Sequence, residues 1–488
     1  MKNRHIILPL IFLAFLSGCA VVGPDYSPPI APVMESFSME GPMKTSKGAD
    51  VTEWWRKLND PSLDALIEHA AANNNDIRIA YARIMEARAN RGVARAERFP
   101  VISARSSAKG LRLSETGLET ANMPESSAAG YDPTQGLTDA GFDASWEIDL
   151  FGRVKREIEA ADAVIETSEA DLEDAMVTLL SELARNYVTL RKTQSQIAII
   201  KQNLDLQQKS LELTLKRFEQ GVDTQLNITR TEALIADTEA RIPVLRTQEK
   251  LLTHRLAALL GETPGFLKTL LDDKPEIPVF PEEIVIGIPA DLLRNRPDIR
   301  AAERNLAART AQIGIAEADL YPRLRLNGSI GLSTVDLEDA SLTKSITGSI
   351  GPSFSWSLFD GGFIRSRIAA ADARSKAALA IYDKTVIRSY EEVENALVEH
   401  SEELRRREHL KKAVAANIKA YDLSMRLYSS GLADYLNVLD SHRGLLQTKE
   451  MLEESNAIVT NSIISLYKAF GGGMAMKETK LPMQIKQP

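Results

Sequence analysis

The hydrophobic pattern of this chain changes period in the middle of a segment. From 140 to 150 the even positions are apolar and the odd positions are small or acidic. From 151 to 216 apolar residues recur instead at every third or fourth position, without any proline. Strict alternation predicts a half-buried strand, whereas the longer period predicts an amphipathic helix. Residues 142–163 are therefore expected to be a strand that turns directly into a helix.

This strand-to-helix segment occurs twice. Residues 354–373 repeat it 210 positions later, with Trp356 and Gly362 in the places of Trp146 and Gly152. Upstream of the strands the two copies match at an offset of 222 instead of 210. The hairpin between the first two strands is therefore twelve residues longer than the hairpin of the second copy. Such differences accumulate in loops, and we expect the strands and helices of the two copies to correspond. Gly152 and Gly362 are expected to form the corners, because the chain turns there from a strand into a helix and a bulkier residue would resist that turn.

Three further stretches have the pattern of strands. Residues 324–332 and 346–358 alternate in the same way, and 102–108 alternates more weakly. Each copy thus supplies two membrane strands whose length and pattern are typical of one pass of an outer-membrane barrel, although a hairpin on a soluble domain would give the same pattern. Four strands cannot close a barrel, so copies of the chain are expected to pool theirs. Two copies would give a plugged eight-strand barrel, whereas three copies would give twelve strands and a water-filled lumen.

The remaining periodic segments predict helices that are too long for a globular core. Besides 151–216, a helix is expected at about 361–428, and each is followed by a glycine turn and a returning helix. The apolar stripe of such a rod must be covered by helices lying alongside, as in a coiled coil or a helical barrel. A further helix is expected at 63–99, with Ser62 as its N-cap. The predicted fold is mainly α with a β-barrel portion, built from long coiled-coil-like helices and membrane strands in two tandem repeats.

The N-terminus has the layout of a secretory signal. Lys2 and Arg4 precede an apolar run that ends at Leu16-Ser17-Gly18-Cys19. Cys19 is the sole cysteine and sits where a bacterial lipoprotein signal places the residue to be acylated, although a plain signal peptide can also end in cysteine. The expected domains are a lipoprotein signal peptide at 1–18, a lipidated extended tether at 19–61, repeat 1 at 62–261, a proline-rich equatorial linker at 262–290, repeat 2 at 291–470 and a disordered tail at 471–488.

Composition and charge exclude several function classes. The formal net charge of −8 argues against a nucleic-acid partner. After the signal, no apolar run reaches the roughly 18 residues that a membrane-spanning helix needs. The histidines are scattered, and neither a phosphate-binding glycine loop nor a nucleophile motif is present. The sequence therefore predicts no enzyme, no metal site and no cofactor.

Three motifs carry a resemblance to a known family. They are WEIDLFGR at 146–153, RPDIRAAE at 296–303, and GPDY at 23–26 shortly after the cysteine. They resemble the outer-membrane factor family, in particular the OprM-like lipoproteins of resistance-nodulation-division efflux pumps, with TolC a more distant relative. The resemblance covers nearly the whole mature chain. It implies a homotrimer in which a twelve-strand barrel in the outer membrane continues as a twelve-helix tunnel through the periplasm.

The resemblance also implies a function. It is that of the exit duct of a tripartite efflux system, through which small molecules and drugs pass passively out of the cell. The implied partners are a periplasmic membrane-fusion (adaptor) protein, an inner-membrane pump of the resistance-nodulation-division type and outer-membrane lipid. The implied location is the Gram-negative outer membrane, with a lipid anchor. Two alternatives stay open: a duct for type I protein secretion, and a periplasmic coiled-coil scaffold lipoprotein that is not a channel.

The two turns between the long helices are the expected sites of adaptor contact. Gly221 with Val222 forms the first predicted tip, and Gly431 with Leu432 forms the second. Each glycine lies between a very long helical segment and the segment that returns from it.

A candidate gate consists of three residues that precede the second turn. Asp422 lies where the resemblance implies a pore-facing acidic ring, so in a trimer three carboxylates would converge, attract cations and slow anions. Arg426 follows one helical turn later, and Ile418, one turn before Asp422, is a candidate apolar constriction. An ordinary surface ion pair between Asp422 and Arg426 is the alternative reading of the same residues.

Overall fold

The computed structural model describes residues 21–31, 34, 36–37, 44–45, 51–112, 114, 134–269, 276–281, 285–286, 288–335 and 342–473. The predicted signal peptide, Cys19 and the longer loop of the first hairpin lie outside these residues, as does the tail from 474 onward. The chain forms two compact units. One comprises Met1–Pro29, Met85–Glu166 and Glu303–Ala380, and the other comprises Ile30–Ile84, Thr167–Ala302 and Ile381–Pro488.

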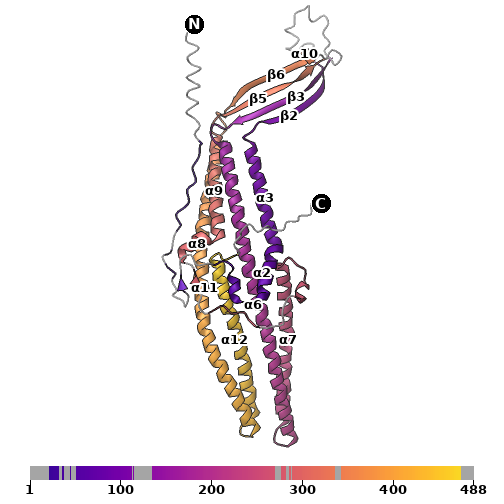
Figure 1. Ribbon diagram of the computed structural model, residues 1–488, viewed down its shortest axis with the longest axis vertical. Helices are drawn as coiled ribbons and strands as arrows, with labels where there is room; N and C mark the ends of the chain where they lie inside the picture. Colours follow the sequence, from indigo (N-terminus) through magenta and orange to yellow (C-terminus); the bar gives the residue numbers. More distant parts are fainter. Residues whose placement is uncertain are drawn as a thin grey trace, which may run out of the picture. The chain divides into compact units, whose positions relative to one another are not determined.

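Helices make up most of the described chain (Figure 1). The helices α6 and α11 contain 67 residues each, and α7 and α12 contain 35 each, so the two copies have helices of equal length. In chain order the elements are β1 (Lys44–Thr45), the 3₁₀ helix η1 (Trp54–Leu58), α2 (Pro61–Asn73), α3 (Asn75–Ala96), β2 (Val101–Arg112), β3 (Thr134–Ile148), α6 (Arg153–Glu219), α7 (Gln225–Leu259), the 3₁₀ helix η2 (Phe266–Thr269), β4 (Val285–Ile286), α8 (Pro289–Asn295), α9 (Pro297–Ala318), β5 (Arg323–Thr334), α10 (Leu342–Ser345), β6 (Ile346–Ser355), α11 (Phe363–Ser429) and α12 (Tyr435–Ala469).

None of the helices in the described part of the chain combines the length and the apolarity that crossing a bilayer requires.

The first unit contains one antiparallel sheet in the order β2-β3-β5-β6 (Figure 1). Each of the four stretches predicted from alternation overlaps one of these strands, although β3 ends at Ile148, two residues before the alternation that begins at 140 does. Strand β6 ends at Ser355, however, whereas the alternation predicts that it continues to 358. Among the described strands, β2 and β6 have a partner on one side only, and β1 with β4 forms a separate two-residue ladder.

The predicted helix at 63–99 is interrupted at Asn74. This residue has an extended backbone, and its side chain accepts hydrogen bonds from the N–H groups of Asp76 and Ile77, so it begins α3 as a new helix. The predicted N-cap was also wrong, because Asp60 rather than Ser62 accepts the N–H bonds of the first turn of α2, with Pro61 at the first helical position. Both differences arise from side-chain hydrogen bonds that the apolar periodicity does not record.

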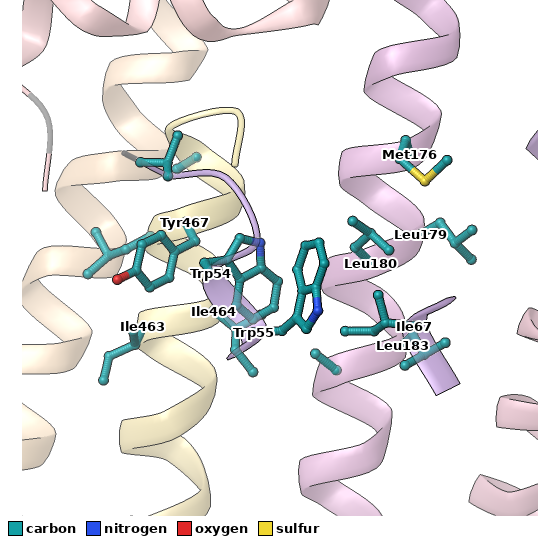
Figure 2. Packing of buried hydrophobic residues seen from close by; sticks show 14 of the residues in the cluster. Trp54, Trp55, Ile67, Met176, Leu179, Leu180, Leu183, Ile463, Ile464 and Tyr467 are labelled. Carbon is teal, nitrogen blue, oxygen red and sulfur yellow. The ribbon is translucent and has the colours of Figure 1, made fainter. Parts of the chain in front are cut away.

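The core of the second unit is built around two tryptophans. Trp54 lies flat against Tyr467, with ring centres 5.7 Å apart, and meets Trp55 edge to face at 5.9 Å. Figure 2 shows both rings between α12 on one side and Met176, Leu179, Leu180 and Leu183 of α6 on the other. The indole N–H of Trp54 donates to the carbonyl oxygen of Gly472 at 3.3 Å. The tail was predicted to be disordered from 471, but its first three residues, Gly471, Gly472 and Gly473, pack against this core and hydrogen-bond to it.

Equivalent hydrogen bonds form at the start of α3 in the first copy and at the start of α9 in the second. Asn74 donates from its side-chain amide to the carbonyl of Leu259, and Arg296, its counterpart at the offset of 222, donates to the carbonyl of Ala469. Arg296 is buried and also pairs with Asp298 and Glu392, at 2.7 and 2.8 Å. It thereby joins the start of α9 to α11 and to the end of α12.

Candidate functional site

Glycines form both corners between strand and helix in the first unit. Gly152 has a φ of +80° and Gly362 a φ of +91°, in the left-handed region that favours glycine. The carbonyl of each glycine accepts the first N–H bond of the helix that follows, from Arg156 in α6 and from Ser366 in α11. The strand therefore bends into the helix at a residue without a side chain.

The tryptophans of the two corners make equivalent hydrogen bonds. The indole N–H of Trp146 donates to the carbonyl of Arg98 at 2.9 Å, and that of Trp356 donates to the carbonyl of Leu320 at the same distance. Arg98 and Leu320 correspond at the offset of 222, just beyond the ends of α3 and α9. The repeat seen in the sequence is thus reproduced in the tryptophan hydrogen bond of each corner.

A buried arginine holds the first described residues of the chain against one corner. The guanidinium of Arg156 donates to the carbonyls of Val22 and Gly23, at 3.1 and 3.0 Å, and pairs with Asp25 at 2.8 Å. The N–H of Val22 donates to the carbonyl of Phe151. The segment after the predicted lipidation site is therefore tied to the end of a predicted membrane strand.

The long helices α6 and α11 end at the two tips of the second unit in the same type of turn. The N–H of Val222 donates to the carbonyl of Arg217 at 3.0 Å, and the N–H of Leu432 donates to the carbonyl of Leu427 at 2.8 Å. The glycine before each, Gly221 or Gly431, has a φ near +75°. This is the Schellman arrangement that ends helices at a left-handed residue. It leaves the side chains of Val222 and Leu432 60% and 77% exposed.

A polar link joins the two tips within one chain. The Tyr428 hydroxyl near the end of α11 hydrogen-bonds to the carboxylate of Asp223, in the turn after α6, and Arg217 lies 4.7 Å from the centre of the Tyr428 ring. The Asp223 side chain is only 4% exposed and also accepts from Asn227 and from the N–H of Thr224. We call Tyr428, Asp223 and Arg217 the tip link.

The electrostatics of the tip link favour a charged carboxylate and a neutral phenol. Burial alone would raise the pKa of Asp223, but the hydrogen bonds from Tyr428, Asn227 and Thr224 and the charge of Arg217 lower it below its ordinary value. Burial and the neighbouring Asp223 carboxylate raise the pKa of Tyr428 to about 12. The hydroxyl therefore remains a donor to an ionised acceptor over the whole physiological range.

Apolar side chains support the tip link. The tip cluster consists of Leu234, Tyr421, Tyr428, Tyr435, Val438, Leu439 and Leu445. His442 is buried beside it, with its ring 5.2 Å from that of Tyr421, and neither of its ring nitrogens has a partner among the described residues. Burial, with a smaller contribution from Lys449, lowers the pKa of His442 to about 4.

The predicted gate residues do not take part in the tip link. Asp422, Arg426 and Ile418 are all exposed on α11, and within the described chain no ion pair joins Asp422 to Arg426. Their counterparts in the first copy, Glu212 and Lys216, do form an ion pair of 2.7 Å.

The tip link itself was missed by the sequence analysis. A signal for it was present, because its residues are positions at which the two copies differ: Tyr428 corresponds to Phe218, and Asp223 corresponds to Ala433. At both positions the residue that departs from the repeat has a partner that the other copy lacks.

The described residues contain no group of three or more histidine, cysteine, aspartate or glutamate side chains that could hold a metal ion.

Comparisons with known proteins identify the family. The model of the family described as "Outer membrane efflux protein" matches residues 66–262 and 288–472. The chain is 33% identical to nodulation protein T of Rhizobium leguminosarum bv. trifolii, over 90% of this chain and 91% of the relative. It is 29% identical to the solvent efflux pump outer membrane protein SrpC of Pseudomonas putida, over 96% of this chain and 99% of the relative.

A solved structure with the same fold is the outer-membrane channel OprN. It superposes with a TM-score of 0.84 and 35% sequence identity, covering 93% of this chain and 99% of OprN. The family and the efflux role predicted from the sequence motifs are thereby confirmed, and the family consists of channels rather than known enzymes. The chain belongs to the outer membrane efflux protein family and serves as an outer-membrane efflux channel.

Proposed function

We propose that three copies of this chain form one duct, with a twelve-strand barrel in the outer membrane and a twelve-helix tunnel in the periplasm. The observation that carries this proposal is the two-faced sheet of the first unit. Its even positions expose Phe142, Ile330 and Ile350, whereas on the opposite face the hydroxyls of Ser329 and Ser349 hydrogen-bond to each other. An apolar face suits lipid and a hydroxyl-rich face suits a water-filled lumen.

Conductance tests this proposal directly. Protein extracted from the outer membrane in detergent should migrate as a trimer that heat dissociates, and it should produce ion-conducting steps in a planar bilayer. A periplasmic scaffold would share the long helices but would conduct no ions. Trimers without conductance would therefore favour the scaffold over the duct.

The N-terminal segment supports a lipid anchor at Cys19. Residues 22–25 are held by Arg156 next to the corner at Gly152, and Cys19 precedes Val22 by three residues, which reach about 10 Å when extended. Acylation of Cys19 would therefore place the acyl chains near the end of a membrane strand. Mass spectrometry of the mature N-terminal peptide should find a diacylglyceryl group, which Cys19→Ser should abolish. An unmodified Cys19 peptide in the wild-type protein would remove the anchor from the proposal.

The tips support docking of a periplasmic adaptor that couples the duct to an inner-membrane pump of the resistance-nodulation-division type. The exposed Val222 and Leu432 stand beyond the ends of their helices, free of the helix packing below them. A photocrosslinker attached through Val222→Cys or Leu432→Cys should capture the adaptor in cells. Val244→Cys is the matched control, because Val244 is as exposed as Val222 but lies within α7. Equal capture by the control would count against tip docking.

Asp422 and Arg426 support a gate near the second tip. Both are exposed and do not form the ion pair that their counterparts Glu212 and Lys216 make, so in a trimer they are available to other copies. Asp422→Ala with Arg426→Ala should raise single-channel conductance and reduce cation selectivity, and Ile418→Ala should widen the same constriction. The double alanine variant of Glu212 and Lys216 is the control. Unchanged conductance and selectivity in the Asp422 variant would refute the gate.

The names of relatives suggest the substrate class. A protein 29% identical over nearly its whole length is described as part of a solvent efflux pump, which points to small, largely apolar organic molecules. Deletion of the gene should sensitise cells to such compounds, and only a conducting form of the protein should restore tolerance.

A further inference from the structure

A cavity of about 550 Å³ lies between α6 and α12, which run side by side in the second unit (Figure 1). The two helices are joined on both sides of it, because Lys192 pairs with Glu454 at 2.7 Å and the hydroxyls of Ser210 and Tyr435 lie 3.0 Å apart. A cavity of this volume suits a small organic molecule. We propose that it binds an organic anion with an apolar body. The site lies within one chain, so it does not depend on the proposed trimer.

One wall of the cavity presents a buried amide without a partner. Asn203 lines the cavity from α6 and is only 6% exposed. The N–H groups of its side chain have no acceptor among the described residues. Burial of an unpaired donor is destabilising, and such donors are rare in folded proteins. The amide therefore needs an acceptor that the described part of the chain does not supply.

Two lysines make the cavity positively charged. Lys201 of α6 and Lys449 of α12 both line it, and neither forms an ion pair within the described chain. The one carboxylate in the lining, that of Asp205, is already paired with Lys209 at 2.6 Å. The unpaired charges at the cavity are thus ammonium groups, and the acceptor that fits beside them carries a negative charge.

The internal repeat singles out two of these three side chains. At the offset of 210, Asn203 corresponds to Ala413 and Lys449 corresponds to Glu239. The second copy therefore has neither the amide nor the positive charge at these positions. At the tips, the residues that depart from the repeat form the link between Tyr428 and Asp223. Asn203 and Lys449 depart from it in the same way but have no partner in the described chain.

The third side chain keeps its identity but loses its partner. Lys201 corresponds to Lys411, which forms an ion pair of 2.7 Å with Glu408 in the preceding turn of α11. In the first copy Ala198 stands at the position of Glu408. Lys201 therefore lacks the carboxylate that neutralises its counterpart, and its charge is available to a ligand.

Much of the remaining lining is apolar. The aliphatic side chains that line the cavity come from both helices: Ile199, Leu206, Leu445 and Leu446. They give an apolar ligand body a surface against which to exclude water. A carboxylate head accepts hydrogen bonds from amide and ammonium groups, and its charge strengthens them. A carboxylate with a short apolar chain matches both parts of the lining.

Photolabelling with an octanoate derivative locates the site. The full-length protein in phosphatidylcholine nanodiscs is irradiated with octanoate that carries a diazirine, and the labelled peptides are identified by mass spectrometry. We expect the label in residues 199–206 of α6 and 445–449 of α12. Unlabelled octanoate should compete for labelling. Octanamide has the same chain without the charge, so it should compete at least about tenfold less well.

Three substitutions test the donors one at a time. Asn203→Leu, Lys201→Met and Lys449→Met each preserve the approximate size of the side chain and remove its polar group. Each should weaken octanoate binding about tenfold, the effect of losing one hydrogen bond to a charged group. Asn203→Leu also removes an unpaired buried donor, so it should not lower the temperature of unfolding. Lys411→Met is the matched control, because Lys411 is the counterpart of Lys201 outside the cavity, and it should leave binding unchanged.

Label confined to other peptides, or no specific label, would overturn the site. Equal competition by octanamide would show that the cavity recognises apolar chains alone, and unchanged affinity in the three variants would overturn the role of their donors. Conductance of the same preparations keeps this test apart from the proposed duct. A protein that conducts but does not bind octanoate would lose the site and keep the duct. A protein that binds octanoate but does not conduct would keep the site and lose the duct.

Discussion

We expect the tip link to favour a closed form of the channel, so removal of the Tyr428 hydroxyl should loosen the tips. Tyr428→Phe keeps the ring in the tip cluster and deletes the hydroxyl's hydrogen bonds to the carboxylate of Asp223 and to the hydroxyl of Thr214. A hydrogen bond to a charged group contributes about 1.5 to 3 kcal/mol. Asp223 keeps its bonds from Asn227 and from the N–H of Thr224, so the lower end of this range applies. About 1.5 kcal/mol is a shift of roughly tenfold toward the open form for each chain.

Single-channel recording in a planar bilayer measures this shift as open probability. Tyr421→Phe is the matched control, because Tyr421 lies in the same cluster and its hydroxyl makes no hydrogen bond with the described residues. Tyr428→Phe should raise the open probability several-fold, while Tyr421→Phe should leave it unchanged. Equal open probabilities in the two variants would show that the link between the tips does not hold the channel closed.

The tip link should not respond to pH in the physiological range. Since the folded state lowers the pKa of Asp223, the stabilisation is complete above the ordinary value of 3.8 and is lost only as the pH falls further, through the lowered pKa. Since the pKa of Tyr428 is raised to about 12, the hydroxyl contributes fully below the ordinary value of 10. The effect of Tyr428→Phe on open probability should therefore be the same at pH 5 and pH 8.

Three further predictions concern stability, measured as the thermal dissociation or unfolding of the purified protein. Folding lowers the pKa of His442 from 6.5 to about 4, so neutral His442 stabilises the folded state fully above pH 6.5, and about 3 kcal/mol of this stability is lost as the pH falls from 6.5 to below 4. His442→Leu should flatten this part of the profile of stability against pH. A variant with the same profile as the wild type would contradict the role of His442. Gly152→Ala should destabilise the protein by about 1 to 3 kcal/mol because position 152 has a positive φ. Gly92→Ala is the control, because Gly92 lies in open space within α3, and it should stabilise the protein by up to about 1 kcal/mol. Similar effects of the two substitutions would argue against a requirement for glycine at the corner. Arg296→Met should destabilise by about 1.5 to 3 kcal/mol because it removes the charged hydrogen bonds to Asp298 and Glu392 and the bond to the carbonyl of Ala469, and a loss below about 1 kcal/mol would show that the cluster is solvated.

Features that depend on neighbours along the chain were predictable. The long helix expected at 151–216 is α6, Arg153–Glu219, and the turns lie at Gly221 and Gly431 as expected. Helical and strand periods are local properties, and a glycine at a left-handed position ends a helix wherever it lies in the fold. The repeat added a long-range constraint, because two copies of one pattern must build two copies of one structure.

The sequence by itself thus determined the helices, the strands, the corner glycines and the family. Only the tertiary structure showed that Asn74 interrupts a helix, that Gly471, Gly472 and Gly473 close the tryptophan core, and that Asp223 rather than Asp422 is the buried acid at the tips. Asn74 caps α3 locally but also bonds to Leu259, Gly472 bonds to Trp54, and Asp223 bonds to Tyr428, so each feature involves a partner far away along the chain. Periodicity records which face of an element is buried, but a hydrogen bond between side chains some 200 residues apart is decided by how the elements pack.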